Sequence, residues 1–179
     1  SSQLVVMAER AEEFLVDVYG APRQKIRLIH HGVPEIPLVE PNHYKAQFEM
    51  EGRELLLTFG LLSPGKGIEY ALRALPPVVE QYPNLCYVVL GATHPNVLKE
   101  QGEAYRLSLQ RLARDLGLQR NVLFTSRFVS LGELCEFLKA ADIYITPYLN
   151  REQITSGTLA YALGAGKPIV STPYWYAEE

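Results

Sequence analysis

Two short polar stretches of the chain contain the residue types that hold a phosphate group. The first is Gly60–Gly67, with the sequence Gly-Leu-Leu-Ser-Pro-Gly-Lys-Gly, between an expected strand and an expected helix. Lys66 supplies a compact positive charge there, and the amides of Gly65 and Gly67 are neighbouring N–H donors. An exposed lysine in an ordinary turn would give the same pattern, so this stretch does not identify a site by itself.

The second stretch is Thr155–Thr158, with the sequence Thr-Ser-Gly-Thr, which precedes a run of small residues at helical spacing. Either Thr155 or Ser156 can cap a helix that begins near Gly157. The unpaired N–H groups and the positive dipole end of such a helix start attract an anion. Ordinary capping without a ligand is the alternative. Because both stretches follow expected strands, we expect Lys66 and this helix start to form one cradle for a diphosphate.

The glycine spacing argues against two other phosphate-binding motifs. Gly60, Gly65 and Lys66 fit the first part of a P-loop, but the position that needs a magnesium-binding Ser or Thr is Gly67. The segment Gly164–Gly166 comes before an expected strand, whereas a dinucleotide-binding fingerprint follows one. We therefore expect neither a P-loop NTPase nor a dinucleotide-binding enzyme.

Composition argues against further classes of function. The net charge of −3 and the lack of a basic stripe argue against nucleic-acid binding. The histidines and cysteines have no metal-site spacing, and Cys86 and Cys135 look like small buried hydrophobes in a reducing, cytoplasmic compartment. No apolar run approaches ~20 residues, which predicts no integral membrane segment, and Leu4–Met7 is too short for the core of a signal peptide.

From residue 55 onward, short apolar segments alternate with amphipathic ones, which predicts strands alternating with helices. We expect the helix at 67–80 to be disturbed by Pro76 and Pro77. The expected strands are Leu55–Phe59, Leu85–Leu90, Val122–Phe124, a run through Ile143 and Ile145, and Pro168–Ser171; the expected helices are 67–80, 102–116, 131–140 and one from near 157. This alternation predicts an α/β fold with a doubly wound parallel sheet, which binds ligands outside the carboxyl ends of its strands.

The first part of the chain is less regular. It predicts a strand at 4–7, a helix at 8–19, a strand at 26–29 and a surface excursion or linker at 34–53, which holds three prolines. A length of 179 residues fits one domain, or one domain with a piece of another. The chain stops at Ala177–Glu179, at an expected helix start, so we expect a fragment cut from a longer protein at both ends.

Six motifs stand in an order that resembles a known family. They are Ile29–Val33, Phe59–Gly67, Val89–Gly91, Asn121–Phe124, Ala141–Pro147 and Ala162–Val170. Each motif is weak alone, but together they resemble the C-terminal, donor-binding half of the GT-B retaining glycosyltransferases of family 4, also called group 1. The resemblance covers nearly the whole chain, and the residues before Ile26 are similar to the last strand and helix of the acceptor-binding half.

This resemblance implies a reaction and a domain plan. The reaction is transfer of a hexose from a UDP- or GDP-linked sugar to a carbohydrate or lipid acceptor, with retention and without a metal or prosthetic group. Residues 1–25 would be the tail end of the acceptor-side domain or a linker, and residues 26–179 a Rossmann-like donor domain truncated at its C-terminus. Because a GT-B active site lies between two halves, the fragment without its N-terminal half should be inactive.

The resemblance also assigns candidate site residues. Lys66 matches the lysine that neutralises the donor diphosphate, whereas Leu61 stands at the position of the family's arginine. The family's two glutamates, eight residues apart, fall on Gln153, with Glu152 beside it, and on Tyr161. We expect Gln153 or Glu152 to bind the donor sugar and Tyr161 to bind the ribose.

Further assignments stay open at this point. The Ser156–Thr158 amides would join Lys66 on the leaving diphosphate, and Arg127 is either a replacement for the missing positive charge or a surface arginine. Leu61 and Tyr161 favour an alternative, a non-catalytic GT-B-like module that binds a nucleotide or a partner. Another GT-B enzyme, an epimerase or a phosphorylase, is a second alternative, although no lysine stands out as a pyridoxal-binding residue.

Overall fold

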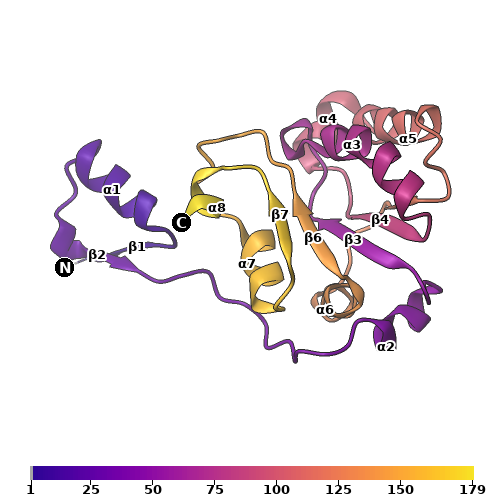
Figure 1. Ribbon diagram of the computed structural model, residues 1–179. Coiled ribbons are helices and arrows are strands. Elements are labelled where there is room, and N and C mark those ends of the chain that lie inside the picture. The colour runs from indigo at the N-terminus through magenta and orange to yellow at the C-terminus, as the bar shows by residue number, and fades with distance from the viewer. Residues whose placement is uncertain (1) are drawn as a thin grey trace.

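The computed structural model describes residues 2–179 and contains a five-stranded parallel sheet. The strands are β3 (Glu54–Phe59), β4 (Leu85–Leu90), β5 (Val122–Thr125), β6 (Ile143–Thr146) and β7 (Ile169–Ser171). Their order in the sheet is β5-β4-β3-β6-β7, so the chain winds outward from β3 in one direction and then restarts at β6 in the other (Figure 1). The predicted doubly wound parallel sheet is therefore confirmed, with its switch point between β3 and β6.

Helices cover both faces of this sheet. They are α3 (Ile68–Gln81), α4 (Pro95–Gln101), α5 (Ala104–Asp115), α6 (Leu131–Ala140), α7 (Gly157–Gly164) and the short α8 (Trp175–Glu178). Alternate residues of β3 point to opposite faces: Leu56 packs with α3 and α5, whereas Leu55 and Leu57 pack with α6 and α7. Burial on both sides thus explains the near-continuous apolar runs of β3 and β4.

Two helix predictions need correction. The helix α3 continues through Pro76 and Pro77, which occupy interior positions and each remove one backbone N–H donor. The expected helix at 102–116 begins at Ala104, and a separate α4 precedes it, opened by Pro95. Gly102 has φ +61° and divides the two helices.

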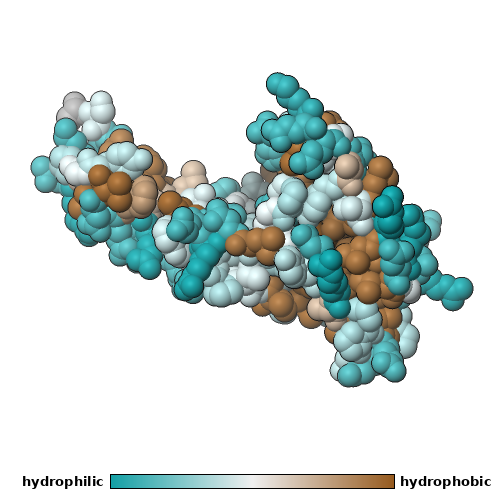
Figure 2. Space-filling model, turned by 90° about the horizontal axis from the view of Figure 1, so that it is seen from above, coloured by the Kyte–Doolittle hydropathy of each residue, from teal (hydrophilic) through white to brown (hydrophobic). Residues whose placement is uncertain are grey.

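The N-terminal segment forms a separate small unit. It contains β1 (Leu4–Val6), α1 (Glu9–Asp17) and β2 (Ile26–Leu28), with a 3-10 turn, η1 (Arg23–Lys25), before β2. The two strands pair in parallel with each other and with no strand of the main sheet. In Figure 1 this unit stands apart at the left, and Figure 2 shows apolar side chains gathered on it. Its exposed apolar residues are Leu4, Val5, Met7, Phe14, Val18 and Tyr19.

An extended strap, residues 29–41, leads from this unit along α7 to the main sheet (Figure 1). Glycines provide the space for it, because a Cβ atom at Gly157 would lie 2.7 Å from His31 Nε2. A Cβ atom at Gly164 would similarly lie 2.8 Å from the side chain of Val33. The glycines of α7 therefore let a neighbouring segment lie close to the helix.

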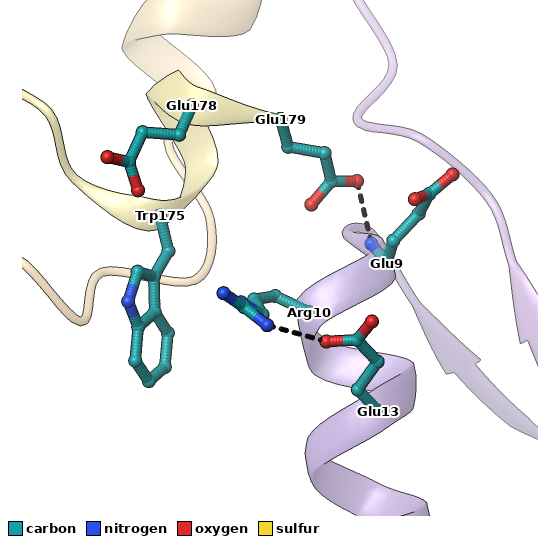
Figure 3. A pocket seen from close by; sticks show the side chains of 6 residues that line it. All are labelled: Glu9, Arg10, Glu13, Trp175, Glu178 and Glu179. Atoms are coloured by element: carbon teal, nitrogen blue, oxygen red, sulfur yellow. Dashed lines mark hydrogen bonds and ion pairs between the residues drawn. The ribbon is translucent and has the colours of Figure 1, made fainter.

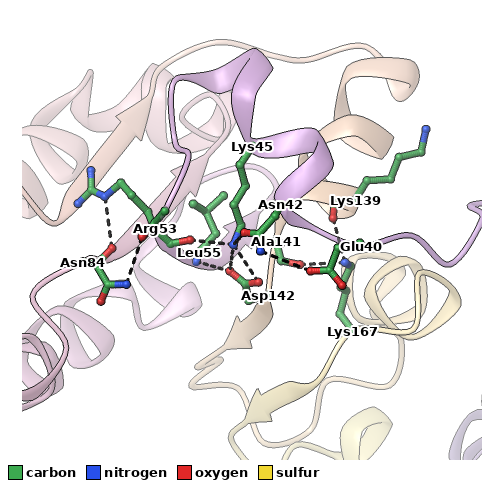
Figure 4. Close-up of polar contacts among 11 residues, drawn as sticks. Glu40, Asn42, Lys45, Arg53, Leu55, Asn84, Lys139, Ala141, Asp142 and Lys167 are labelled. Carbon is green, nitrogen blue, oxygen red and sulfur yellow. Dashed lines mark hydrogen bonds and ion pairs between the residues drawn. The ribbon is translucent and has the colours of Figure 1, made fainter.

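The segment after the strap is part of the folded core. It forms α2 (Asn42–Lys45) and a 3-10 turn, η2 (Ala46–Phe48), and Phe48 stacks on Phe137 of α6 with ring centroids 4.0 Å apart. Lys45 is only 2% exposed and lies 2.7 Å from the Asp142 carboxylate (Figure 4). The prediction of a surface excursion or linker at 34–53 holds only for the part within the strap. Residues 42–53 are attached to the sheet, because Lys45 pairs with the partly buried Asp142, the residue before β6.

Within residues 2–179, no helix has the length and apolar character needed to cross a bilayer, and no group of His, Cys, Asp and Glu side chains could hold a metal ion. Both cysteines are thiols, with Cys86 buried and Cys135 half-buried. Burial raises the pKa of the Cys86 thiol, so it behaves as an apolar core residue.

Candidate functional site

The two stretches singled out in the sequence meet at the switch point of the sheet. Gly60–Gly67 follows the carboxyl end of β3, and Pro147–Ser156 follows that of β6. The Leu149 amide donates a hydrogen bond of 3.0 Å to the Gly65 carbonyl, which joins the two loops directly. The sheet thus brings together the segments that carry Lys66 and the start of α7.

A chain of hydrogen bonds connects Lys66 to the start of α7. Lys66 Nζ donates to the Tyr148 hydroxyl at 2.5 Å and lies 3.8 Å from the centroid of the Tyr148 ring. The same hydroxyl lies 2.8 Å from Thr158 Oγ1, and Thr158 Oγ1 lies 3.2 Å from Ser156 Oγ. The ammonium group and the helix start are therefore two side chains apart, and Tyr148, which sequence reasoning missed, is the central link.

The cap of α7 is Ser156 rather than Thr155. Ser156 has extended backbone angles, and its hydroxyl accepts a hydrogen bond of 3.2 Å from the Leu159 amide. The amides of Gly157 and Thr158, in the first turn, have no acceptor within the helix. They carry the positive end of the helix dipole and suit a negatively charged ligand.

The loop Gly60–Gly67 positions Lys66 through its backbone conformation, and it offers fewer free amides than expected. Residues Pro64–Lys66 form a 3-10 turn, η3, and the Gly67 amide donates to the Pro64 carbonyl at 3.2 Å. This bond removes Gly67 from the expected phosphate donors. Gly65 lies inside the turn, next to Lys66.

The residues expected at the sugar and ribose lie on either side of the helix start. The Gln153 side chain donates to the Thr155 carbonyl at 3.0 Å, and Glu152 beside it is exposed. Tyr161 is half-buried one turn into α7, with its ring edge-on to His31 at 5.7 Å. Within residues 2–179, no hydrogen bond joins Glu152, Gln153 or Tyr161 to the chain of bonds from Lys66 to Ser156.

Arg127 points to a different partner. Its guanidinium forms a bidentate ion pair with the Glu133 carboxylate in the first turn of α6. The hydrogen bond from Glu133 raises the pKa of Arg127, and the same contact lowers the pKa of Glu133. Of the two readings of Arg127, the structure matches a paired surface arginine, and its charge is not brought to Lys66.

An apolar cavity of about 180 Å³ lies beside the start of α7. Residues from the ends of β3 and β4, the loop after β5, and α6 and α7 line it: Phe59, Gly60, Leu61, Leu90, Gly91, Ala92, Phe128, Val129, Leu134 and Thr158. Thr158 is shared between this cavity and the hydrogen bonds to Lys66. The site therefore offers an apolar cavity next to a helix start and the hydrogen bonds that lead to Lys66, which fits a ligand with a flat ring and a phosphate.

A buried arginine fixes one rim of this cavity. Arg106 is 3% exposed, and its guanidinium donates to the Gly91 carbonyl at 2.8 Å and to Glu103 at 3.1 Å. Thr93 completes the cluster by donating to Glu103 at 2.5 Å. The sequence places Arg106 off the apolar face of its helix, but the structure buries it because it satisfies the loop after β4.

A second cavity lies between α1 and α8 (Figure 3). Arg10 is the positively charged residue of its lining, and it faces four carboxylates, those of Glu9, Glu13, Glu178 and Glu179. Arg10 is already engaged, since it pairs with Glu13 at 2.9 Å and lies 5.5 Å from the ring of Trp175. This cavity therefore has the wrong charge for a phosphate.

Comparison with known proteins finds glycosyltransferases. The chain is 26% identical over 178 residues to an uncharacterised glycosyltransferase of Methanocaldococcus jannaschii, covering 95% of this chain and 42% of that protein. It is 28% identical over 107 residues to the GDP-mannose-dependent alpha-(1-6)-phosphatidylinositol monomannoside mannosyltransferase of Mycolicibacterium smegmatis, covering 60% of this chain and 25% of that one. Among solved structures, Anabaena HepE in complex with UDP and glucose superposes with a TM-score of 0.77 at 16% identity, covering 99% of this chain and 46% of that chain.

The evidence for the fold and the evidence for the family come from different comparisons. The likeness to the Anabaena structure shows the fold, and the chain spans less than half the length of that protein and of the archaeal relative. The family rests on a direct match of residues 53–179 to the model for glycosyl transferases group 1. This range contains the whole five-stranded sheet and both loops of the candidate site. The chain therefore belongs to the group 1 glycosyl transferases.

Proposed function

We propose that this chain is the donor-binding half of a retaining glycosyltransferase that transfers a hexose from a nucleotide diphosphate sugar. The observation that carries the proposal is the link from Lys66 through Tyr148 and Thr158 to the start of α7. These hydrogen bonds connect an ammonium group to a helix N-terminus at the switch point of the sheet, which supports a shared role in holding one diphosphate.

The proposed chemistry follows from these charges. When the bond between the sugar and the diphosphate breaks, negative charge builds up on the leaving diphosphate. Lys66 and the amides of Gly157 and Thr158 are held in place before the reaction, so they stabilise this charge without reorganisation. The apolar cavity takes the nucleoside base, Tyr161 binds the ribose, and Gln153 or Glu152 binds the hexose.

The donor is a UDP- or a GDP-linked sugar. The Mycolicibacterium relative uses GDP-mannose by its name, and the Anabaena structure contains UDP and glucose. The apolar lining of the cavity does not select between the two bases, because it offers few side-chain donors or acceptors. The acceptor is a carbohydrate or a lipid.

A second domain completes the proposed active site. Residues 1–25 belong to the acceptor side or to a linker, and residues 26–179 form the donor side. The apolar side chains exposed on the N-terminal unit would be covered by the rest of the acceptor-side domain. The two unbridged thiols suit a reducing compartment, so we place the reaction in the cytoplasm.

The test is a donor panel assayed with the complete protein, meaning this chain together with its acceptor-side domain. We expect release of UDP or GDP from one donor, and a product whose anomeric configuration, read by NMR, equals that of the donor. Binding of UDP or GDP without turnover of any donor would instead support the alternative, a non-catalytic nucleotide- or partner-binding module, which the departures at Leu61 and Tyr161 favour.

A further inference from the structure

We propose that Tyr148 is a positioning residue, whose hydroxyl holds the Lys66 ammonium at the start of α7. This inference rests on the proposed function of the same site and adds a residue to it. Tyr148 stands immediately after Pro147, which follows the end of β6, so a rigid strand determines where the phenol group lies.

The Tyr148 side chain is held in a fixed position. It is 2% exposed, and its ring stacks on Tyr174 with centroids 5.3 Å apart and an angle of 22° between the rings. Lys66, in contrast, is half-buried on a flexible four-carbon stem. A fixed acceptor next to a flexible cation restricts the cation to one position, which is the condition for preorganised charge stabilisation.

The direction of the hydrogen bonds agrees with this role. An ammonium group has only donors, so the Tyr148 oxygen must accept from Lys66. The phenol proton is then available for Thr158 Oγ1 at 2.8 Å, and Thr158 can in turn donate to Ser156 Oγ at 3.2 Å. The contact with Tyr148 uses one of the three N–H groups of Lys66, which leaves two for the oxygens of a diphosphate.

Tyr174 provides a matched control. Its ring stacks on Tyr148, and its hydroxyl lies 3.2 Å from Thr146 Oγ1 instead of near Lys66. Tyr148→Phe removes the hydroxyl that meets Lys66 but keeps the ring under the ammonium group. Tyr174→Phe makes the same chemical change on the neighbouring ring.

The experiment is a double-mutant cycle in the complete protein with Lys66→Ala, Tyr148→Phe and the combined variant. For Tyr148→Phe we expect kcat to fall ~10-fold with a smaller change in KM for the donor, and a melting temperature lowered by only a few degrees, because one buried hydroxyl is lost. In the Lys66→Ala background the same substitution should have no further effect, because the group that it positions is gone. Tyr174→Phe should keep the wild-type kcat.

The outcomes separate this inference from the proposed function. If Lys66→Ala lowers turnover but Tyr148→Phe is neutral, or lowers it equally in both backgrounds, the positioning role is wrong and the function stands. If Lys66→Ala changes nothing, the role of Lys66 and with it that of Tyr148 are both wrong. If no donor is turned over, calorimetry measures the Kd for UDP and GDP in the same variants. Tyr148→Phe should then weaken binding in the wild-type background and have no further effect in the Lys66→Ala background.

Discussion

Gly67 and Pro147 approach so closely that a Cβ atom at Gly67 would lie 2.1 Å from the Pro147 carbonyl oxygen. Gly67 also has φ +63°, a conformation that side chains disfavour. The loops after β3 and β6 are therefore in backbone contact at the switch point. This contact brings Lys66, the residue before Gly67, next to Tyr148, the residue after Pro147.

Gly67→Ala should consequently damage both stability and the site. The clash and the backbone strain together should lower the free energy of unfolding by ~2 kcal/mol or more, and UDP or GDP should bind more weakly. Gly117→Ala is the control, because Gly117 has φ +73° with no atom within 4 Å of a Cβ position and should cost only ~1 kcal/mol. Urea unfolding of the two variants gives the comparison, and equal losses would mean that the contact with Pro147 has no energetic weight.

Lys66→Ala should lower turnover of the complete protein by ~10²-fold or more, because it removes a preorganised positive charge from the leaving diphosphate. Lys99→Ala, which removes an exposed lysine from α4, should leave kcat unchanged. Steady-state kinetics with the donor found in the panel measures both variants. Wild-type turnover of the Lys66→Ala protein would remove this residue from the mechanism.

Acid should loosen the rim of the apolar cavity through Glu103. The hydrogen bond from Thr93, followed by Arg106, lowers the pKa of Glu103 below its ordinary value of 4.5. As the pH falls below 4.5, the unfolded state takes up this proton before the folded state does, so stability declines until the folded pKa is passed. Glu103→Gln should therefore lose less stability than the wild type in this acid range.

The measurement for Glu103 is urea unfolding at a series of pH values from neutral to acid. Glu80→Gln, a change at an exposed position of α3, should follow the wild-type curve. A Glu103→Gln curve parallel to the wild type would show that the contacts with Thr93 and Arg106 contribute nothing to acid stability.

Lys45→Ala should destabilise the domain by ~3 kcal/mol, because it leaves the partly buried Asp142 carboxylate without its cation. Lys45 also donates to the Arg53 carbonyl at 2.7 Å, and Asp142 accepts from the Leu55 amide at 2.6 Å (Figure 4). Lys139→Ala removes a half-buried α6 ammonium that pairs with Glu136 and should cost less than ~1 kcal/mol, because that pair reaches the surface. Urea unfolding compares the two, and similar losses would contradict a special role for the buried pair.

The sheet could be predicted from the sequence because each of its central strands is marked by a local run of apolar residues. Strands such as Leu85–Leu90 are buried on both faces, so an unbroken apolar run marks them, and their alternation with helices dictates a parallel sheet. The loops after β3 and β6 could be paired in advance for a related reason. The carboxyl ends of parallel strands share one edge, so Lys66 and Thr158 had to lie on the same side of the sheet.

Other features depend on tertiary contacts that no local pattern reports. Tyr148 looks like a residue that merely follows a strand, and only the fold shows that its hydroxyl meets Lys66. Arg106 looks like a solvent-exposed helix residue, but it is buried because it donates to the Gly91 carbonyl in the loop after β4 and to Glu103 at the start of its own helix. Lys45 lies in a proline-rich segment whose connection to Asp142 spans 97 residues.

Whether Lys66 and the start of α7 hold one diphosphate is decided by a crystal structure of the complete protein with UDP or GDP bound. We expect diphosphate oxygens at ~3 Å from Lys66 Nζ and from the amides of Gly157 and Thr158, with the base in the apolar cavity. A nucleotide bound elsewhere, with neither Lys66 nor the α7 amides on its phosphates, would contradict it.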